Sequence, residues 1–309
     1  MIYLTDRTDV KIEYETALTL GKFDGIHRGH RKLLSKVMEH SPGLKTVVFT
    51  FDINPTIAVS GSPGTVLTTN EERRSVVERF GIDYLYECPF TEEIRNMEAA
   101  DFVRKIVNDL NVRYIAVGSD FGFGHNRAGD YRLLQDLADE LGYSVEVVDK
   151  VMYGDREISS TYIREVIAGG DMVTAQKMLG YPYTVEGTVG YGRQLGRTIG
   201  IPTTNVIPIK AKLLPPNGVY VSRVRIDGEE HPGVTNIGVK PTVGDENEKG
   251  AETFIFDFDR DVYGHEISIE LFYYIRAEKK FLSIADLKAQ MEKDISFTRE
   301  YQIDKSEIF

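Results

Sequence analysis

The sequence contains a single cysteine, Cys88, and no tryptophan. One cysteine cannot form an intramolecular disulfide, and it cannot supply a thiolate metal cluster within one chain. A fold held together by disulfides is therefore excluded. Cys88 lies among apolar residues in YLYECPF, and we expect it to have a plain structural role.

Positive charge is also in short supply. The chain has 37 Lys and Arg residues against 48 Asp and Glu residues, a formal net charge of −11 and a pI of about 5.2. No excess basic field is available to neutralise a nucleic-acid backbone, so a general DNA- or RNA-binding role is disfavoured. Small phosphorylated ligands remain possible, because a few local donors are enough to bind them.

Long apolar runs are missing as well. No stretch has the length needed to span a bilayer, and the start, MIYLTDRTDVKIEYET, is too acidic and polar for a secretory signal. We therefore expect a cytoplasmic protein with no membrane partner. The sequence carries no signal for an oligomeric state.

The length of 309 residues exceeds the usual size of one hydrophobic core and favours two domains. With 41% hydrophobic and 28% charged residues, the composition is that of an ordinary globular protein. Periodicity changes at about residue 183, and Gly180 and Pro182 in LGYPY end a helical pattern there. We predict a first domain over residues 1–183 and a second over residues 184–309.

The first domain alternates short apolar runs with helical patterns. These segments are ALTLGKF then RKLLSKVMEH, KTVVFTF then NEERRSVVERF, and YIAVGSD then YRLLQDLADEL. Such alternation predicts right-handed crossovers and a doubly wound α/β domain with a parallel sheet. In this class of sheet, ligands bind beyond the carboxyl ends of the strands.

The second domain contains strand-like runs separated by Gly, Pro, Asn and Asp. The runs are YTVEGTVGYG, GVYVSRVRID, GVTNIGVKPTV, ETFIFDFD and ISIELFYYIRAE. Their spacing indicates an antiparallel barrel or sandwich, and we expect a small all-β barrel. In SIADLKAQMEKDI, Ser283 is a helix-cap candidate before apolar residues at helical spacing, which predicts a C-terminal helix.

The strongest local signal is GKFDGIHRGH, residues 21–30, between a predicted strand and a predicted helix. Glycines let a backbone approach phosphate closely, and a helix N-terminus adds free N–H groups and a positive dipole end. His27 and His30 project from about the same side of the first turn and could donate hydrogen bonds where charge grows on a phosphate. Two alternatives remain: a cap plus a surface residue, or a zinc site.

Two further segments have the chemistry of phosphate sites. In ISSTYIR, residues 158–164, hydroxyls open a helix and an arginine follows within one turn, although an ordinary capped helix has the same pattern. The segment GYGRQLGRTIGIPTTN, residues 190–205, could be a phosphate-wrapping flap or a structural hairpin. Its Thr203 and Asn205 offer hard oxygen ligands to Mg²⁺.

The first of these patterns resembles the HxGH signature of the nucleotidyltransferase superfamily, in the form found in FAD synthetases. The resemblance implies a Rossmann-like domain in which His27 and His30 bind ATP phosphates and stabilise the transition state. It also implies nucleotide or flavin contacts from the residues of the matching motifs. These residues are Gly21, Phe23, Asp24, Gly25, Gly29, Asp120, Ser160, Thr161 and Arg164.

The sequence departs from the FAD synthetase pattern at two positions of this domain. Lys22 stands where asparagine or threonine is common, and Asn54 stands where histidine is usual.

The GRTIGIPTTN segment resembles the riboflavin kinase signature. The resemblance implies that Thr203 and Asn205 bind Mg²⁺ with ATP and that Gly196 and Arg197 belong to the nucleotide-binding flap. A kinase for a primary alcohol needs a carboxylate to accept the hydroxyl proton, and the family pattern points to Glu252. Asn236 and Arg276 are the corresponding flavin-site candidates.

Together the resemblances cover nearly the whole chain and identify it with bifunctional riboflavin kinase/FAD synthetases. They imply that riboflavin and ATP give FMN and ADP in the second domain, and that FMN and ATP give FAD and pyrophosphate in the first. Mg²⁺ is the expected cofactor of each reaction. The alternatives are a nucleotidyltransferase for another substrate, such as a phosphopantetheine or cytidylyltransferase substrate, and a flavin-binding regulator without turnover.

Overall fold

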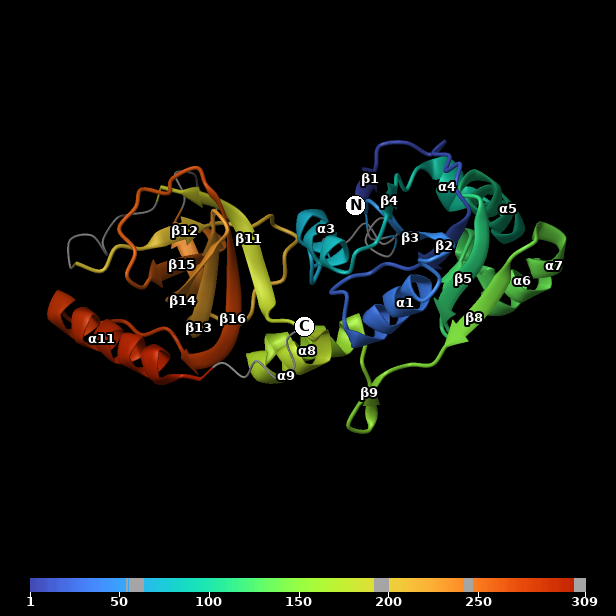
Figure 1. Cartoon of the computed structure of the whole chain (residues 1–309). Coiled ribbons are helices and arrows are strands. Elements are labelled where there is room, and N and C mark those ends of the chain that lie inside the picture. The colour runs from blue at the N-terminus through green and yellow to red at the C-terminus, as the bar shows by residue number, and fades with distance from the viewer. Residues whose placement is uncertain (54, 56–63, 192–199, 242–246, 303–309) are drawn as a thin grey trace. The chain divides into compact units, whose positions relative to one another are not determined.

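The structure is a computed structural model that describes residues 1–53, 55, 64–191, 200–241 and 247–302. It divides into two compact units (Figure 1). The first comprises Met1–Gly64 and Asn70–Ser159, and the second comprises Thr65–Thr69 and Ser160–Phe309. The expected functional boundary after residue 183 stays a prediction.

The first unit is built on a six-stranded parallel sheet, as the alternation of strands and helices predicts. In spatial order its strands are β1 (Ile2–Leu4), β4 (Tyr84–Cys88), β3 (Lys45–Phe51), β2 (Thr16–Leu20), β5 (Val112–Gly118) and β8 (Ser144–Val148). Every residue of β2 is buried, which is typical of a central parallel strand covered on both faces.

Helices pack on the strands of this sheet. Helix α1 (Arg28–Met38) packs on β2, β3 and β5, α5 (Ala99–Asp109) packs on β5, and α6 (Tyr131–Asp136) and α7 (Ala138–Leu141) pack on β8. The described part of this unit also contains the helical segments α3 (Asn70–Arg79), α4 (Glu92–Asn96) and η1 (His125–Arg127). Two small hairpins pair β6 (Gly122–Phe123) with β7 (Gly129–Asp130), and β9 (Met152–Tyr153) with β10 (Arg156–Glu157).

The strand order reverses between β2 and β5. The chain proceeds from β2 outward to β3 and β4 on one side, and then from β5 to β8 on the other. This reversal is the topological switch point, where the carboxyl ends of neighbouring strands leave a crevice for a ligand. The segment that starts at Gly21 leaves β2 here, and the segment that contains Asp120 leaves β5 here.

The second unit is a closed antiparallel barrel of six strands, which confirms the predicted barrel. Around the barrel the strands are β11 (Tyr183–Gly190), β12 (Thr204–Val206), β15 (Asn247–Ile255), β14 (Glu229–Pro241), β13 (Gly218–Ile226) and β16 (Glu266–Arg276). Closure leaves no free sheet edge.

Within its described residues, the second unit has three helices besides the barrel. Helix α8 (Ser160–Ala168) is followed by α9 (Met172–Leu179), which packs on β16 and ends at Gly180 in a left-handed conformation. Helix α11 (Ile284–Glu300) begins at Ser283, whose hydroxyl accepts a hydrogen bond from the Asp286 N–H at 3.1 Å, and this confirms the predicted cap. Among the described residues, no helix has both the length and the apolar character needed to cross a bilayer.

A buried ion pair ties α11 to the barrel. The Nη2 of Arg276, at the end of β16, lies 2.6 Å from Oδ2 of Asp294, and its Nε lies 3.0 Å from Oδ1. The side chain of Asp294 is only 4% exposed, and Gln290 donates a third hydrogen bond to it at 3.0 Å. Removing the carboxylate would leave a largely buried guanidinium without its counter-charge.

We expect Asp294→Ala to lower the free energy of unfolding of the barrel by about 3–5 kcal/mol, the usual cost of breaking a buried pair. Urea unfolding followed by circular dichroism measures the change. Asp257→Asn is the matched control, because it removes an exposed ion pair with Arg299 on the same helix and should cost less than about 1 kcal/mol. Equal losses in the two variants would contradict the role given to Asp294.

Candidate active sites

The turn from β2 to α1 has an unusual backbone. Phe23, Gly25 and Ile26 have φ angles of 45°, 84° and 22°. Phe23 and Ile26 are nonetheless completely buried. Left-handed backbone is costly for a bulky or β-branched residue and persists only where surrounding contacts enforce it, a situation that is frequent at functional sites.

Burial of the Phe23 ring organises the turn. The ring meets the ring of His30 edge to face, with centroids 5.2 Å apart. It also lies against Gly21, where a Cβ atom would come within 3.2 Å of it. Gly21 is therefore needed for packing at the end of β2, and Phe23 forms one wall of the histidine site.

The rings of His27 and His30 stack, with centroids 3.8 Å apart and planes 17° apart. His27 is the N-cap of α1, and its Nδ1 accepts a hydrogen bond from the His30 N–H at 3.4 Å. A Cβ on Gly29 would lie 3.1 Å from this Nδ1. Of the alternative in which the two histidines are a cap and a surface residue, the first half is correct, because His27 caps the helix. His30 is half-buried and is not a surface residue.

Both imidazoles are neutral at pH 7. Burial lowers the pKa of His27 to about 4, against the opposing effect of the Asp120 carboxylate. Burial, followed by repulsion from His27, holds the pKa of His30 well below its usual value of 6.5. Because Nδ1 of His27 accepts a hydrogen bond, its proton is on Nε2 and can be donated to a ligand. Nδ1 of His30 is buried without a hydrogen-bond partner among the described residues.

Asp120 lies across the switch point from the histidines, in the segment that leaves β5. Its Oδ2 is 3.2 Å from Nζ of Lys150, which is also 2.5 Å from the Glu157 carboxylate. Gly118 leaves room for the carboxylate, since a Cβ there would meet Oδ1 at 3.2 Å. Lys150 was not predicted from the sequence, because it is 30 positions from Asp120 and lies in no motif.

The ISSTYIR segment opens a helix, as predicted. Ser160 and Thr161 are the first two residues of α8, and Arg164 follows one turn later. The Arg164 guanidinium donates a hydrogen bond to the carbonyl of Thr65 at 3.2 Å. These three residues belong to the same compact unit as the barrel, and their predicted role as phosphate contacts stays a prediction.

In the barrel, three polar residues form a row across adjacent strands. Asn205 on β12 pairs in register with Glu252 on β15, which pairs with Asn236 on β14. Their strand neighbours are buried, for example Thr204, Thr253 and Thr235, so the row lies on the opposite face of the sheet. Thr203, two residues before Asn205, donates a hydrogen bond from its hydroxyl to the Glu252 carboxylate at 2.8 Å.

Glu278 extends this row. The Asn236 amide donates a hydrogen bond to one Glu278 oxygen at 3.2 Å, and Asn217 donates to the other at 3.1 Å. A Cβ on Gly238 would clash with the carboxylate in this position, so a larger residue there would require the Glu278 side chain to move. Glu278 was not predicted from the sequence, although it lies two residues after Arg276, the predicted flavin-site candidate, whose guanidinium is bound to Asp294.

A cavity of about 380 Å³ adjoins Thr203. Its wall includes Pro202 and Thr253 and the charged residues Arg260 and Asp261. Tyr263 also lines the cavity and stacks on Tyr191, with ring centroids 4.2 Å apart. None of these cavity side chains except Thr203 is among the site residues predicted from the sequence.

Thr203, which lines this cavity, belongs to a set of donors that fits a magnesium–nucleotide complex. Mg²⁺ prefers hard oxygen ligands, takes few from the protein and keeps water and phosphate oxygens for the rest. The hydroxyl of Thr203, the amide of Asn205 and the carboxylate of Glu252 are such ligands. The Thr203 hydroxyl is hydrogen-bonded to the Glu252 carboxylate. Gly196 and Arg197 of the predicted flap, and Asn54 in the first unit, lie outside the described residues.

Comparisons with known proteins match both halves of the chain. The sequence model described as FAD synthetase matches residues 9–162, and the model described as riboflavin kinase matches residues 179–302. A bifunctional riboflavin kinase/FMN adenylyltransferase of Listeria monocytogenes is 36% identical over 298 residues, which cover 95% of each chain. The protein of the same description from Escherichia coli K12 is 37% identical over 290 residues, which cover 92% of each chain.

A solved structure also matches along nearly the whole chain. It is the crystal structure of a Streptococcus pneumoniae protein described as a macrolide-efflux protein. The TM-score is 0.87 at 31% sequence identity, and the match covers 97% of this chain and 99% of the other. The likeness therefore extends over both compact units.

The charge state of His27 predicts a pH dependence of stability. Between pH 6.5 and pH 4 the unfolded chain takes up a proton at this residue while the folded chain does not, so stability falls as the pH falls. His27→Asn removes this titration and keeps a good N-cap residue. We expect the loss of unfolding free energy between pH 7 and pH 4 to be smaller in His27→Asn by about 3 kcal/mol.

Urea unfolding at a series of pH values measures this difference. His125→Asn serves as the control, because His125 belongs to the same compact unit but lies outside the histidine site, and it should retain the wild-type slope. If His27→Asn loses stability on acidification as steeply as the wild type, His27 is not held neutral by burial.

Proposed function

The chain belongs to the family of bifunctional riboflavin kinase/FMN adenylyltransferases, and we propose how its residues divide the two reactions. It phosphorylates riboflavin to FMN with ATP and adenylylates FMN to FAD with release of pyrophosphate. The observation that supports the division is the separation of two polar sites. The stacked histidines lie in one compact unit, and the Thr203–Glu252 hydrogen bond lies in the other.

Adenylyl transfer is assigned to the switch point of the parallel sheet. An oxygen of the FMN phosphate attacks the α-phosphorus of ATP, and the bond from that phosphorus to the departing pyrophosphate breaks. The Nε2–H of His27 donates a hydrogen bond to a phosphate oxygen on which charge grows, and His30 lies beside it. Neither histidine forms a covalent intermediate, so catalysis rests on positioning and on fixed donors in a site of low polarity.

The turn around the histidines serves the same reaction. Gly21, Phe23, Asp24, Gly25 and Gly29 shape the main chain at the start of α1, where N–H groups and the helix dipole favour a phosphate. Asp120 is proposed as a contact to nucleotide or flavin, and its pairing with Lys150 keeps it near the switch edge. Ser160, Thr161 and Arg164 are proposed as further phosphate contacts.

Phosphorylation of riboflavin is assigned to the polar row of the barrel. Glu252 accepts the proton of the primary hydroxyl of riboflavin as that oxygen attacks the γ-phosphorus of ATP, and ADP leaves. The hydrogen bond from Thr203 orients the carboxylate for this step. Asn236, next to Glu252 in the row, is proposed to contact the substrate, and Arg276 retains a proposed role at the edge of the flavin site.

Thr203 and Asn205 would hold Mg²⁺ at this site, with ATP in the adjoining cavity. When bound, the ion neutralises phosphate charge and fixes the nucleotide for in-line transfer. Gly196 and Arg197 are proposed as the flap over the phosphates. A second magnesium requirement is proposed for adenylyl transfer.

Incubation of the protein with riboflavin, ATP and Mg²⁺, with the flavins separated over time, tests the division. We expect His30→Ala to lower FAD formation from FMN at least about 100-fold and to leave FMN formation within about twofold of the wild type. Glu252→Ala should lower FMN formation at least about 100-fold and spare the conversion of added FMN to FAD. Loss of both activities in either variant would contradict two separate sites.

Each variant has a matched control. His40→Ala removes a histidine whose ring packs against Tyr114 in the same unit, away from the β2 turn. Glu266→Ala removes the acceptor of another threonine–glutamate hydrogen bond in the barrel, the one from Thr188. Both controls should retain both activities.

A further variant tests the hydroxyl ligand. Thr203→Val keeps the shape of the side chain but removes both the proposed Mg²⁺ ligand and the hydrogen bond to Glu252. Riboflavin kinase kcat/KM for MgATP should fall about 10- to 100-fold, and the Mg²⁺ concentration for half-maximal rate should rise. Thr188→Val is the control and should change neither quantity. A normal Mg²⁺ dependence in Thr203→Val would remove Thr203 from the proposed ligand set.

A further inference from the structure

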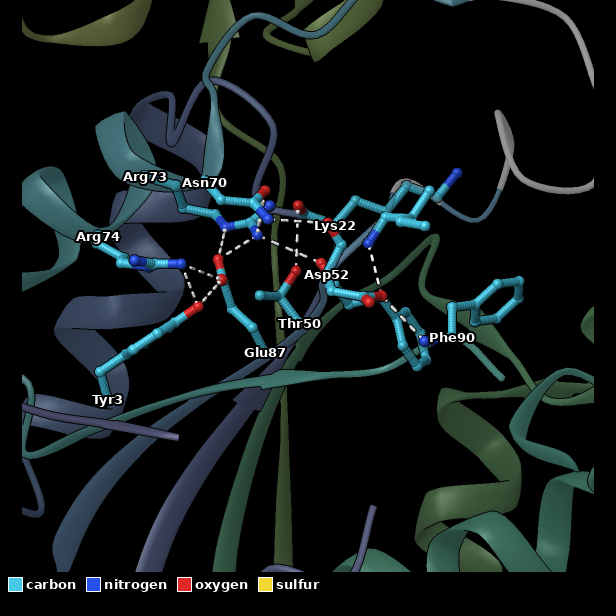
Figure 2. A network of polar contacts seen from close by, with 11 residues as sticks. Tyr3, Lys22, Thr50, Asp52, Asn70, Arg73, Arg74, Glu87 and Phe90 are labelled. Atoms are coloured by element: carbon cyan, nitrogen blue, oxygen red, sulfur yellow. Dashed lines mark hydrogen bonds and ion pairs between the residues drawn. The ribbon is translucent and has the colours of Figure 1, made fainter. Parts of the chain in front are cut away.

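A buried ion pair lies where β3 and β4 end beside α3 (Figure 2). Glu87, in β4, is completely buried, and the side chain of Arg73, in α3, is 7% exposed. Nε of Arg73 donates a hydrogen bond to Oε1 of Glu87 at 2.8 Å, and Nη2 contacts the same oxygen. Two charges survive such burial only if their remaining hydrogen-bonding groups are also satisfied.

The second oxygen of Glu87 is satisfied as well. Its Oε2 accepts a hydrogen bond from the Tyr3 hydroxyl at 2.5 Å and lies 3.5 Å from Nη2 of Arg74. Arg74 also donates to the Tyr3 hydroxyl and lies over the Tyr3 ring at 3.7 Å. Both carboxylate oxygens therefore have partners, Oε1 from α3 and Oε2 from β1 and α3, and these contacts fix the orientation of Glu87.

Arg73 uses its remaining hydrogen bonds to hold the end of β3. Its Nη2 donates to the carbonyl of Phe51 at 3.3 Å and to the side-chain oxygen of Asn70 at 2.9 Å. The Asn70 amide in turn donates to the carbonyl of Asp52 at 2.9 Å. The ion pair therefore anchors two consecutive carbonyls at the point where β3 stops pairing.

Asp52 connects this anchor to the residues after β4. Its Oδ1 accepts hydrogen bonds from the N–H groups of Ile53 at 2.8 Å and Phe90 at 2.9 Å. Figure 2 shows Asp52 between the Arg73 cluster and Phe90. The ends of both strands are thus tied to the same network.

Thr50 carries the connection to the histidine turn. It pairs in register with Glu87 across β3 and β4, so the two side chains are neighbours on one face of the sheet. The Thr50 hydroxyl donates to the carbonyl of Lys22 at 3.3 Å, and the Gly21 N–H donates to the carbonyl of Phe49 at 3.2 Å. The start of the loop that leads to His27 is therefore held by the end of β3.

We propose that Glu87 and Arg73 are positioning residues for adenylyl transfer, acting through the end of β3 and the Thr50–Lys22 hydrogen bond on the turn that carries the histidines. The proposal rests on the assignment of that reaction to His27 and His30. Neither residue of the pair touches the reacting groups. Their effect is on where the turn places its donors, and a displacement of 1 Å in such a site can cost about 100-fold in rate.

The same two strands offer a matched control at their other ends. Asp83, just before β4, accepts hydrogen bonds from the Lys45 ammonium at 2.8 Å and from the Thr46 N–H at 2.9 Å. In parallel strands the amino ends lie at the edge opposite the ligand crevice. Asp83→Asn therefore weakens the same pair of strands without disturbing the histidine turn.

The experiment compares Glu87→Gln, Thr50→Val and Asp83→Asn in the full chain. FAD formation from FMN is measured at a temperature below each variant's unfolding transition, and kcat is corrected for the folded fraction seen by circular dichroism. We expect kcat to fall about tenfold in Glu87→Gln and about threefold in Thr50→Val, while KM for ATP and the riboflavin kinase rate stay within about twofold. Asp83→Asn should lower the melting temperature and leave corrected kcat unchanged.

A double-mutant cycle tests the route of the effect. If Glu87 acts through Thr50, the double variant Glu87→Gln/Thr50→Val should lose no more activity than Glu87→Gln alone. Multiplied losses in the double variant would overturn the route, and an unchanged corrected kcat in both single variants would overturn the proposal. Thr50→Val leaves the ion pair intact, so its corrected kcat can still be measured if Glu87→Gln fails to fold.

The outcomes also separate this proposal from the assignment of the histidines. If the wild type forms FAD and His30→Ala does not, the assignment holds, and the Glu87 and Thr50 variants then decide the positioning role alone. If His30→Ala forms FAD at the wild-type rate, the assignment itself fails, whatever the other variants do.

Discussion

The stacking of His27 on His30 constrains the rest of the first unit. Two imidazolium rings with centroids 3.8 Å apart would repel each other, so at least one ring must be neutral, and burial favours the neutral form of both. Burial provides that condition, and the left-handed turn at Phe23 and Ile26 provides the burial. The backbone strain and the packing of Phe23 therefore both serve to bury the two histidines, and this burial keeps them neutral.

A neutral pair also determines how a phosphate can be bound. In the proposed site the histidines would donate directed hydrogen bonds but add no net charge, so main-chain N–H groups and the dipole of α1 would contribute to the attraction. In the barrel, the polar side chains are positioned in a different way. There the antiparallel register places Asn205, Glu252 and Asn236 side by side, so strand pairing, and not a strained turn, positions these oxygen-bearing side chains.

Much of this architecture could be predicted from the sequence because it depends on local patterns. The alternation of apolar runs indicated the parallel sheet, the short strands indicated the barrel, and Ser283 marked the start of α11. The half-burial of His30 could not be predicted, because it follows from a left-handed conformation that a phenylalanine at position 23 does not signal. Partners far apart in the chain were also missed. These pairs are Glu87 with Arg73, Asp120 with Lys150, and Asn236 with Glu278.

The Glu87–Arg73 pair shows why a buried charge can be retained where apolar residues would pack as well. When β3 ends, the carbonyls of Phe51 and Asp52 leave the ladder and still require donors. The guanidinium of Arg73 supplies several donors in a fixed plane, and Glu87 balances its charge in a site that water does not reach. An apolar replacement could restore packing density but would leave the Phe51 carbonyl without its Arg73 donor and would remove the hydrogen bond that orients Asn70 toward the Asp52 carbonyl. The ion pair is therefore better understood as fixing the geometry of the strand end than as adding stability.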